Sequence, residues 1–247
     1  MTGRLETSYS KLLKYVRVVA NPFKKVIIVT ECKIHKFINT QALEILKNDN
    51  FTDAYNFFSD YLSYLNAGVT WPDQDLKSMG HFYNPFKGRG LYGNKSALTL
   101  GVEYYEEALQ SWLAGDVEIA MFYLGAAIHL VQDMTVPQHA NIRLLDSHKQ
   151  FETFIKRTYL QSPVFTVHEG GYYYMRCINE AITCNARNSI NIFTRLKKIE
   201  DEYKRFYTIT KFILPLAQKS SAGCLLMFYK DTARQYVRCG RKEPVFP

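Results

Sequence analysis

The sequence predicts an all-α protein, a single compact multi-helix domain. Apolar residues recur at helical spacing along most of the chain, whereas the alternation of apolar and polar residues that is typical of strands is scarce. No segment repeats at a fixed period. Hydrophobic residues make up 47% of the 247 residues and aromatic residues 15%, which is enough for one sizeable core.

The first predicted helices lie between residues 34 and 65. Apolar side chains fall on one face over 34–46 and again over 54–65, with a polar break at 48–50. The composition then changes to glycine, proline, asparagine and aromatic residues over 66–93. This change predicts a long ordered loop of the kind that often carries function.

Helix start and stop signals place the next elements. A helix is expected over 96–113, with Gly115 at its C-cap, and Asp116 stands in the N-cap position of a second helix that Pro137 limits. Further helices are predicted over 147–159, 173–195, 197–218 and 220–237. Almost the whole chain is thereby assigned to helices joined by turns.

Charge and cysteine content narrow the function classes. The formal charge of +8 and the pI near 9.1 favour an anionic partner, which is a phosphate-bearing substrate, a membrane surface or nucleic acid. Five cysteines without a CxxC pair argue against a disulfide framework and favour a reducing compartment. The apolar runs of the basic segment 1–30 are too short for a signal peptide or a membrane span, so we expect a cytoplasmic or peripheral membrane location.

Two pairs of residues at helical spacing point to metal binding. His129 and Asp133 are four residues apart, and so are His148 and Glu152. Residues at i and i+4 project from one helical face, one turn apart, which is the separation at which two ligands reach one zinc ion. Either pair alone also occurs as an ordinary surface pair, but here a turn carrying His139 joins the two.

His129 lies within an apolar run over 122–131, so a buried core histidine is the alternative interpretation. Asp133 would then be a buried carboxylate beside a buried imidazole, which is costly unless both are paired or bound to metal. Metal would satisfy both groups together. His139, His148 and Glu152 form a candidate second zinc site with one position open for water or a phosphate oxygen.

These motifs together resemble the bacterial zinc-dependent phospholipase C family, part of the phospholipase C and single-strand nuclease superfamily. The likeness rests on Phe-Tyr-Leu-Gly at 122–125 with His129 and Asp133, and on Pro137 with His-Ala-Asn at 139–141. It extends to His-Phe-Tyr-Asn-Pro at 81–85, to the pair of His148 and Glu152, and to Ile-His-Lys-Phe-Ile-Asn at 34–39, all in the family's order.

The resemblance implies a zinc cluster in a cleft of an all-α fold. It assigns one zinc to Asp73, His81, His129 and Asp133, a second to His139, His148 and Glu152, and a third to His35 with Asp133 as a bridge. Asp73 would be both a ligand and the general base. Asp75 competes for this role because the loop before His81 is shorter here than in better-known members.

The third site departs from the family pattern, which uses an N-terminal tryptophan shortly before the histidine. No tryptophan precedes His35, and Glu31 or Cys32 could take its place as a ligand, unless Cys32 is simply a small buried residue. We therefore expect two zinc ions and leave the third open. Residues 1–30 would be a basic extension and 31–247 the catalytic domain, although the family is usually secreted.

The implied function is hydrolysis of phospholipids to diacylglycerol and a phosphorylated head group, by a monomer at a membrane surface. A single-strand nuclease is the alternative enzyme, because a basic, aromatic-rich chain could bind nucleic acid. It fits less well, since the nuclease pattern ends in aspartate where this chain has Glu152. A metal-binding member of the family without turnover is the third possibility.

Overall fold

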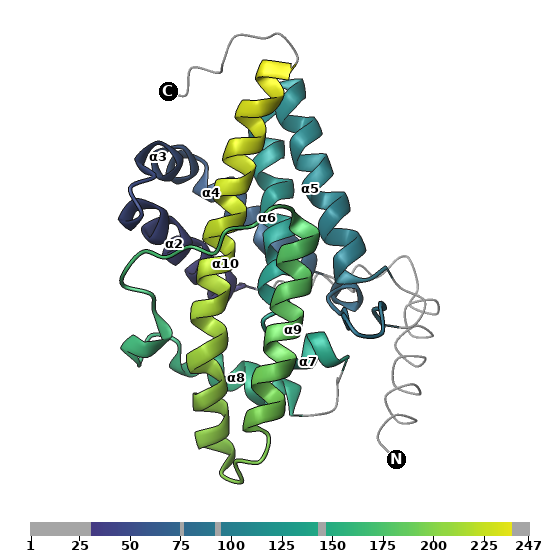
Figure 1. Ribbon diagram of the computed structural model, residues 1–247, viewed down its shortest axis with the longest axis vertical. Helices are drawn as coiled ribbons and strands as arrows, with labels where there is room; N and C mark the ends of the chain where they lie inside the picture. Colours follow the sequence, from purple (N-terminus) through teal and green to yellow (C-terminus); the bar gives the residue numbers. More distant parts are fainter. Residues whose placement is uncertain (1–30, 75–76, 92–94, 143–146, 239–247) are drawn as a thin grey trace.

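The computed structural model describes residues 31–238, apart from 75–76, 92–94 and 143–146, and it is built of helices (Figure 1). The predicted basic extension over 1–30 lies outside the described residues. Within those residues no strand occurs, and one isolated bridge pairs Asn84 with Arg89. The predicted all-α fold is thereby confirmed. The α-helices are α2 Lys33–Asn48, α3 Thr52–Asp60, α4 Leu62–Thr70, α5 Ala97–Ala114, α6 Val117–Asp133, α7 Pro137–Asn141, α8 His148–Thr158, α9 Ile178–Leu196 and α10 Glu202–Arg238, and the 3₁₀ helices are η1 Trp71–Asp73, η2 Lys77–Gly80 and η3 Pro163–Phe165.

Helix α6 is the central element of the core. It packs against α4 on one side and α5 on another, and every residue from Leu124 to Asp133 is buried. A helix that is apolar around most of its circumference is stable only when it is surrounded in this way. The two polar ligand candidates near its end, His129 and Asp133, are therefore carried into the interior.

Two glycines allow α4 and α6 to approach closely. A Cβ atom on Gly125 would lie 2.1 Å from the carbonyl oxygen of Leu65, and one on Gly68 would lie 1.9 Å from that of Phe122. Only residues without a side chain fit this crossing. The close approach brings the backbone at the end of α4 against His129.

The longest helix, α10, runs along the length of the molecule (Figure 1). It packs against α2 and α9. A short turn joins the end of α9 to the start of α10, and the two helices lie side by side. Its stretch from Leu216 to Phe228 is buried except at Lys219. Helices α7 and α8 lie near the lower half of this pair in Figure 1 and bring their ligand candidates toward the end of α6.

The helix boundaries differ from the sequence prediction in four places. The segment predicted as one helix over 54–65 contains two, because the chain breaks at Tyr61, and α4 continues to Thr70, so the loop begins after residue 70 rather than at 66. Helix α9 starts at Ile178 rather than near 173. The predicted helices over 197–218 and 220–237 form one helix, α10, which contains Pro215 in its interior.

These differences have a common cause, because tertiary packing decides where marginal helix signals are used. Burial of α10 between its neighbours outweighs the cost of the interior proline. The predicted C-cap at Gly115, which has a φ of 90°, is confirmed. At the start of the same helix the Ser96 hydroxyl accepts from the Thr99 N–H, a cap that was not predicted. Asp116 precedes α6 as predicted, but its side chain makes no capping hydrogen bond. Within the described residues, no helix combines the length and the apolar character that crossing a bilayer requires.

Candidate metal centre

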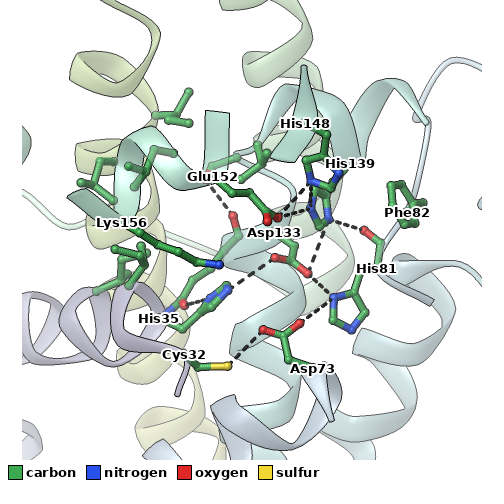
Figure 2. Close-up of a pocket in the computed structure, with 18 of the residues that line it drawn as sticks. Cys32, His35, Asp73, His81, Phe82, Asp133, His139, His148, Glu152 and Lys156 are labelled. Atoms are coloured by element: carbon green, nitrogen blue, oxygen red, sulfur yellow. Dashed lines mark hydrogen bonds and ion pairs between the residues drawn. The ribbon is translucent and has the colours of Figure 1, made fainter. Parts of the chain in front are cut away.

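The eight predicted ligand candidates come together in one cluster (Figure 2). They arrive from six parts of the chain: the start of α2, η1, the segment after η2, the end of α6, α7 and the start of α8. Figure 2 shows most of them pointing toward one another at one wall of a pocket. The cluster consists of His35, Asp73, His81, His129, Asp133, His139, His148 and Glu152.

Four side chains form the inner part of the cluster, and Asp73 is the most exposed of them. Nδ1 of His81 and Nε2 of His129 lie 3.2 Å apart. These nitrogens lie 2.8 and 3.1 Å from Oδ2 of Asp133. They lie 3.5 and 3.6 Å from Oδ1 of Asp73. Two imidazole nitrogens and two carboxylates therefore face a common centre.

A second group lies closer to solvent, on α7 and α8. Nε2 of His139 and Nε2 of His148 are 2.9 Å apart. Oε1 of Glu152 lies 3.0 Å from the His148 nitrogen and 3.8 Å from the His139 nitrogen. The Glu152 side chain is 40% exposed, so this group has an open side.

His35 extends the inner group on the opposite side of Asp133. Its Nε2 lies 3.6 Å from Oδ1 of Asp133, whereas His81 and His129 approach Oδ2. One carboxylate thus faces two sets of imidazoles with its two oxygens. This is the arrangement that the predicted bridging role of Asp133 requires.

Backbone carbonyls hold three of the histidine rings. Nδ1 of His129 lies 2.7 Å from the Val69 carbonyl oxygen, and Nε2 of His81 lies 3.1 Å from that of Pro72. Nδ1 of His139 lies 3.1 Å from the carbonyl oxygen of His81. A carbonyl only accepts, so each of these nitrogens carries the proton and the other ring nitrogen presents its lone pair to the cluster.

Gln132 holds the His35 ring in the same way, and sequence reasoning missed it. Its Oε1 accepts from Nδ1 of His35 at 2.7 Å, while its Nε2 donates to Asn39 Oδ1 and Ser221 Oγ at 2.9 and 3.1 Å. Asn39 in turn donates to Asn66. The available signal was a polar residue next to Asp133 in an otherwise apolar helix.

Backbone conformations with positive φ occur beside three ligand segments. Cys32, with a φ of 46°, precedes α2 and His35, and Ser147, with a φ of 52°, precedes His148. Ile142, with a φ of 56°, ends the short helix of His139. Such conformations cost free energy for residues with side chains, and they are common at active and ligand-binding sites.

The carboxylates and imidazoles of the cluster shift one another's pKa values. Burial opposes ionisation of Asp133, but the neighbouring imidazoles, His129 first, outweigh it and hold its pKa well below the usual range. Burial also opposes protonation of His129, yet Asp133 and Asp73 raise its pKa to about 9. Burial and the neighbouring His129 lower the pKa of His35 to about 4. The carboxylates are thereby held in the ionised form that metal binding requires.

This donor set fits zinc. Zinc binds imidazole nitrogen and carboxylate oxygen at about 2.0–2.2 Å in tetrahedral sites, which places ligand atoms about 3.3 Å apart. The measured separations within both groups lie between 2.8 and 3.8 Å. Lone pairs of two histidines that face each other at 2.9 or 3.2 Å require a cation or proton between them. Oδ2 of Asp133, which is buried, has no hydrogen bond to any described residue.

The sequence left two choices open, Glu31 or Cys32 as a third-site ligand and Asp73 or Asp75 as the general base. The Glu31 side chain is 70% exposed and pairs with Lys33 at 2.7 Å. The Cys32 thiol donates to Oδ2 of Asp73 at 3.0 Å, and burial raises its pKa. Asp73 is thereby at the cluster, whereas Asp75 lies outside the described residues.

A cavity of about 430 Å³ opens beside the cluster. All ligand candidates except His129 line one wall, and the remaining surface is mostly apolar, with Lys33 and Lys156 also among the lining residues. The apolar side chains belong to Ile34, Ile38, Met79, Phe82, Leu91, Val136, Ile155, Ile213 and Leu214.

Fold and site together define an all-α protein in which histidines and carboxylates that could hold metal gather beside a cavity. The chain belongs to the zinc-dependent phospholipase C family, whose sequence profile matches residues 34–213. The resemblance seen in the sequence is confirmed by this match. Zinc is thus the metal that the family name supports.

Individual relatives agree with the family. The chain is 30% identical over 146 residues to a phospholipase C of Clostridium haemolyticum, covering 49% of this chain and 37% of the relative. It is 25% identical over 235 residues to one of Clostridium novyi, covering 81% and 59%. The alpha toxin of Clostridium absonum has the same fold, with a TM-score of 0.70 at 22% identity over 81% of this chain and 64% of the toxin. The chain therefore spans less than two thirds of the length of these proteins.

Proposed function

We propose that this protein is a zinc-dependent phospholipase C. It hydrolyses the phosphodiester of a phospholipid on the glycerol side of the phosphate, and the products are diacylglycerol and a phosphorylated head group. Its partner is the membrane surface that presents the lipid, and it acts as a monomer. The supporting observation is the position of a histidine and carboxylate centre on one wall of an apolar cavity.

The histidine nitrogens that carry no backbone hydrogen bond support the following ligand set. We assign one zinc to Asp73, His81, His129 and Asp133, and a second to His139, His148 and Glu152. His139 belongs to the second group because its Nδ1 is directed at the His81 carbonyl, which leaves Nε2 for the metal. Bound zinc supplies a Lewis acid for the phosphate oxygens and lowers the pKa of water.

Asp73 is the general base in this assignment. Its side chain is 25% exposed, in contrast to 5% for Asp133, so water reaches it from the cavity. Its Oδ1 faces His81 and His129, which fixes the carboxylate within the cluster. From there it accepts the proton of the water that attacks phosphorus.

Cys32 is the candidate ligand for a third metal position, beside His35 and Asp133. Its thiol already contacts Asp73, whereas Glu31 is directed to Lys33. Metal binding would ionise the thiol, which burial otherwise keeps protonated.

The experiment compares Asp73→Asn and Asp75→Asn with the wild type in a diacylglycerol release assay. We expect Asp73→Asn to lose roughly 10²–10⁴-fold or more in turnover, and Asp75→Asn to remain close to wild type. Zinc content and a thermal melt confirm that each variant folds and keeps the second metal. A dead Asp75→Asn variant would shift the general base by two residues.

The same preparations are tested on single-stranded DNA. The apolar cavity wall favours lipid over nucleotides, so we expect release of diacylglycerol without nuclease products. Cleavage of DNA with intact phospholipid would overturn the phospholipase assignment. Bound zinc without hydrolysis of either substrate would instead show a family member without turnover.

A further inference from the structure

Lys156 is a cation of the cavity wall that the proposed reaction leaves without a role. It lies on α8 two turns after His148 and one turn after Glu152, so the three residues share one helix face. Figure 2 shows its side chain extending from α8 into the pocket, with the ammonium group directed toward the region of His35 and Asp133. Lys156 is one of the residues that line the cavity.

The usual partner of Lys156 is occupied elsewhere. A glutamate four residues before a lysine on a helix commonly pairs with it. Here Oε1 of Glu152 lies 3.0 Å from His148 and 3.8 Å from His139, so that carboxylate belongs to the metal centre. Among the described residues, no carboxylate oxygen lies within ion-pair distance of the Lys156 ammonium.

Lys33, the other lysine that lines the cavity, already has a carboxylate partner. Lys33 pairs with Glu31 at 2.7 Å, and both side chains are largely exposed. Asp73, Asp133 and Glu152, the carboxylates of the wall, all face histidines. Within the part of the chain that the structure describes, Lys156 is therefore a lysine of the cavity lining without a paired carboxylate, and it lies beside the place where a substrate phosphate would lie.

We infer that Lys156 selects phospholipids by the charge of the head group, favouring anionic ones such as phosphatidylglycerol over choline lipids. The inference rests on the proposed function, because it places the lipid phosphate at the metal centre. Lys156 is itself exposed, yet a quaternary ammonium group bound beside it in the cavity would meet like charge, whereas a head group without a cation would not. Bound zinc would add positive charge to the site and would strengthen the preference for anionic head groups.

The test uses monomeric short-chain substrates, because the basic chain would bind any anionic vesicle and hide selection within the cavity. The kcat/KM ratio of dihexanoyl phosphatidylglycerol to dihexanoyl phosphatidylcholine is measured below the micelle concentration. We expect a ratio above one for the wild type. Lys156→Met should lower the ratio by roughly threefold and Lys156→Glu by roughly tenfold, as for a single partly exposed charge.

Arg157→Glu is the matched control. It makes the same change of charge at the neighbouring position of α8, but Arg157 lines a separate surface groove with Lys149 and Thr153. The ratio should stay at the wild-type value. A second readout is calorimetric binding of the products glycerol phosphate and phosphocholine to the zinc-loaded proteins, in which Lys156→Glu should reverse the order of affinity.

Three outcomes would overturn the inference. The first is a wild-type ratio at or below one, and the second is a ratio that Lys156→Glu and Arg157→Glu change equally. The third is an equal loss with both substrates in Lys156→Glu, which would mean that Lys156 contacts the phosphate itself. In each of these cases the wild type still hydrolyses phospholipid, whereas failure of the proposed function would show as no hydrolysis of either lipid.

Discussion

The carboxamide of Gln132 fixes which nitrogen of His35 faces the metal centre. Gln132 Oε1 accepts from His35 Nδ1 at 2.7 Å, which leaves His35 Nε2 at 3.6 Å from Asp133 Oδ1. The amide cannot rotate freely, because its Nε2 donates to Asn39 and Ser221. A residue that contacts no metal therefore orients a ligand.

Replacing Gln132 with leucine should weaken metal binding at the His35 side of Asp133. The imidazole loses its acceptor, and loss of an outer partner of a ligand costs roughly 10–100-fold in metal affinity. The measurement is a competition titration with a chromophoric chelator. Ser221→Ala, which removes only one of the two acceptors of the Gln132 amide, is the control and should keep near wild-type affinity. Equal affinities in all three proteins would contradict the orienting role.

Purified protein should contain at least two zinc ions per chain, as determined by elemental analysis. Removing them with a chelator should lower the melting temperature, because ligands that bind only the native state stabilise it. One site at free metal a thousandfold above its Kd contributes about 4 kcal/mol, which corresponds to roughly 10 °C for a chain of this size. Less than one zinc per chain after reconstitution would rule out the metal centre.

Asp133→Asn should reduce activity more than Glu152→Gln. Asp133 is buried and faces His35 with one oxygen and His81 and His129 with the other, whereas Glu152 serves one pair and is 40% exposed. We expect Asp133→Asn to fall to background and to lose more than one metal, with a smaller loss for Glu152→Gln, by roughly tenfold or more. The checks are diacylglycerol release and zinc content. Equal and mild effects would contradict the bridging geometry.

Cobalt should report whether Cys32 binds a third metal. If the thiolate is a ligand, the Co²⁺-substituted protein has a sulfur-to-metal charge-transfer band in the near ultraviolet, and Cys32→Ser lacks it. The same variant should bind one metal fewer while keeping the other two. Cys224→Ser removes a buried thiol on α10 and is the control, in which the band should remain. A wild-type spectrum without the band would assign Cys32 a packing role only.

Gly125→Ala should destabilise the fold although alanine is the better helix former. The preference for alanine in an open helix is about 1 kcal/mol, but here a Cβ would lie 2.1 Å from the Leu65 carbonyl oxygen. We expect a net loss of about 1–3 kcal/mol in the free energy of unfolding, measured by urea denaturation. Gly101→Ala is the control, because its Cβ meets only the flexible end of Ile182. A smaller loss for Gly125→Ala than for Gly101→Ala would contradict the close crossing.

Most helices and both ligand pairs could be predicted from the sequence, because they depend on residues that are close together along the chain. Periodicity places His129 next to Asp133, and His148 next to Glu152, within one turn of one helix. Both pairs do lie together. The break at Tyr61 was missed and the break predicted between residues 218 and 220 is absent, because the packing of α4 and the burial of α10 outweighed the local signals.

The sequence by itself determined the helical class, the family resemblance and the residue types of the centre, since these depend on spacing along the chain. Only the tertiary structure decided which ring nitrogen each histidine presents. The acceptor for His129 is the Val69 carbonyl and that for His35 is the Gln132 amide, which lie 60 and 97 residues away along the chain. The tertiary structure also separated Glu31 from Cys32 and, among the described residues, left Lys156 without a paired carboxylate. Such contacts are fixed when helices pack, and local patterns of residues carry no record of them.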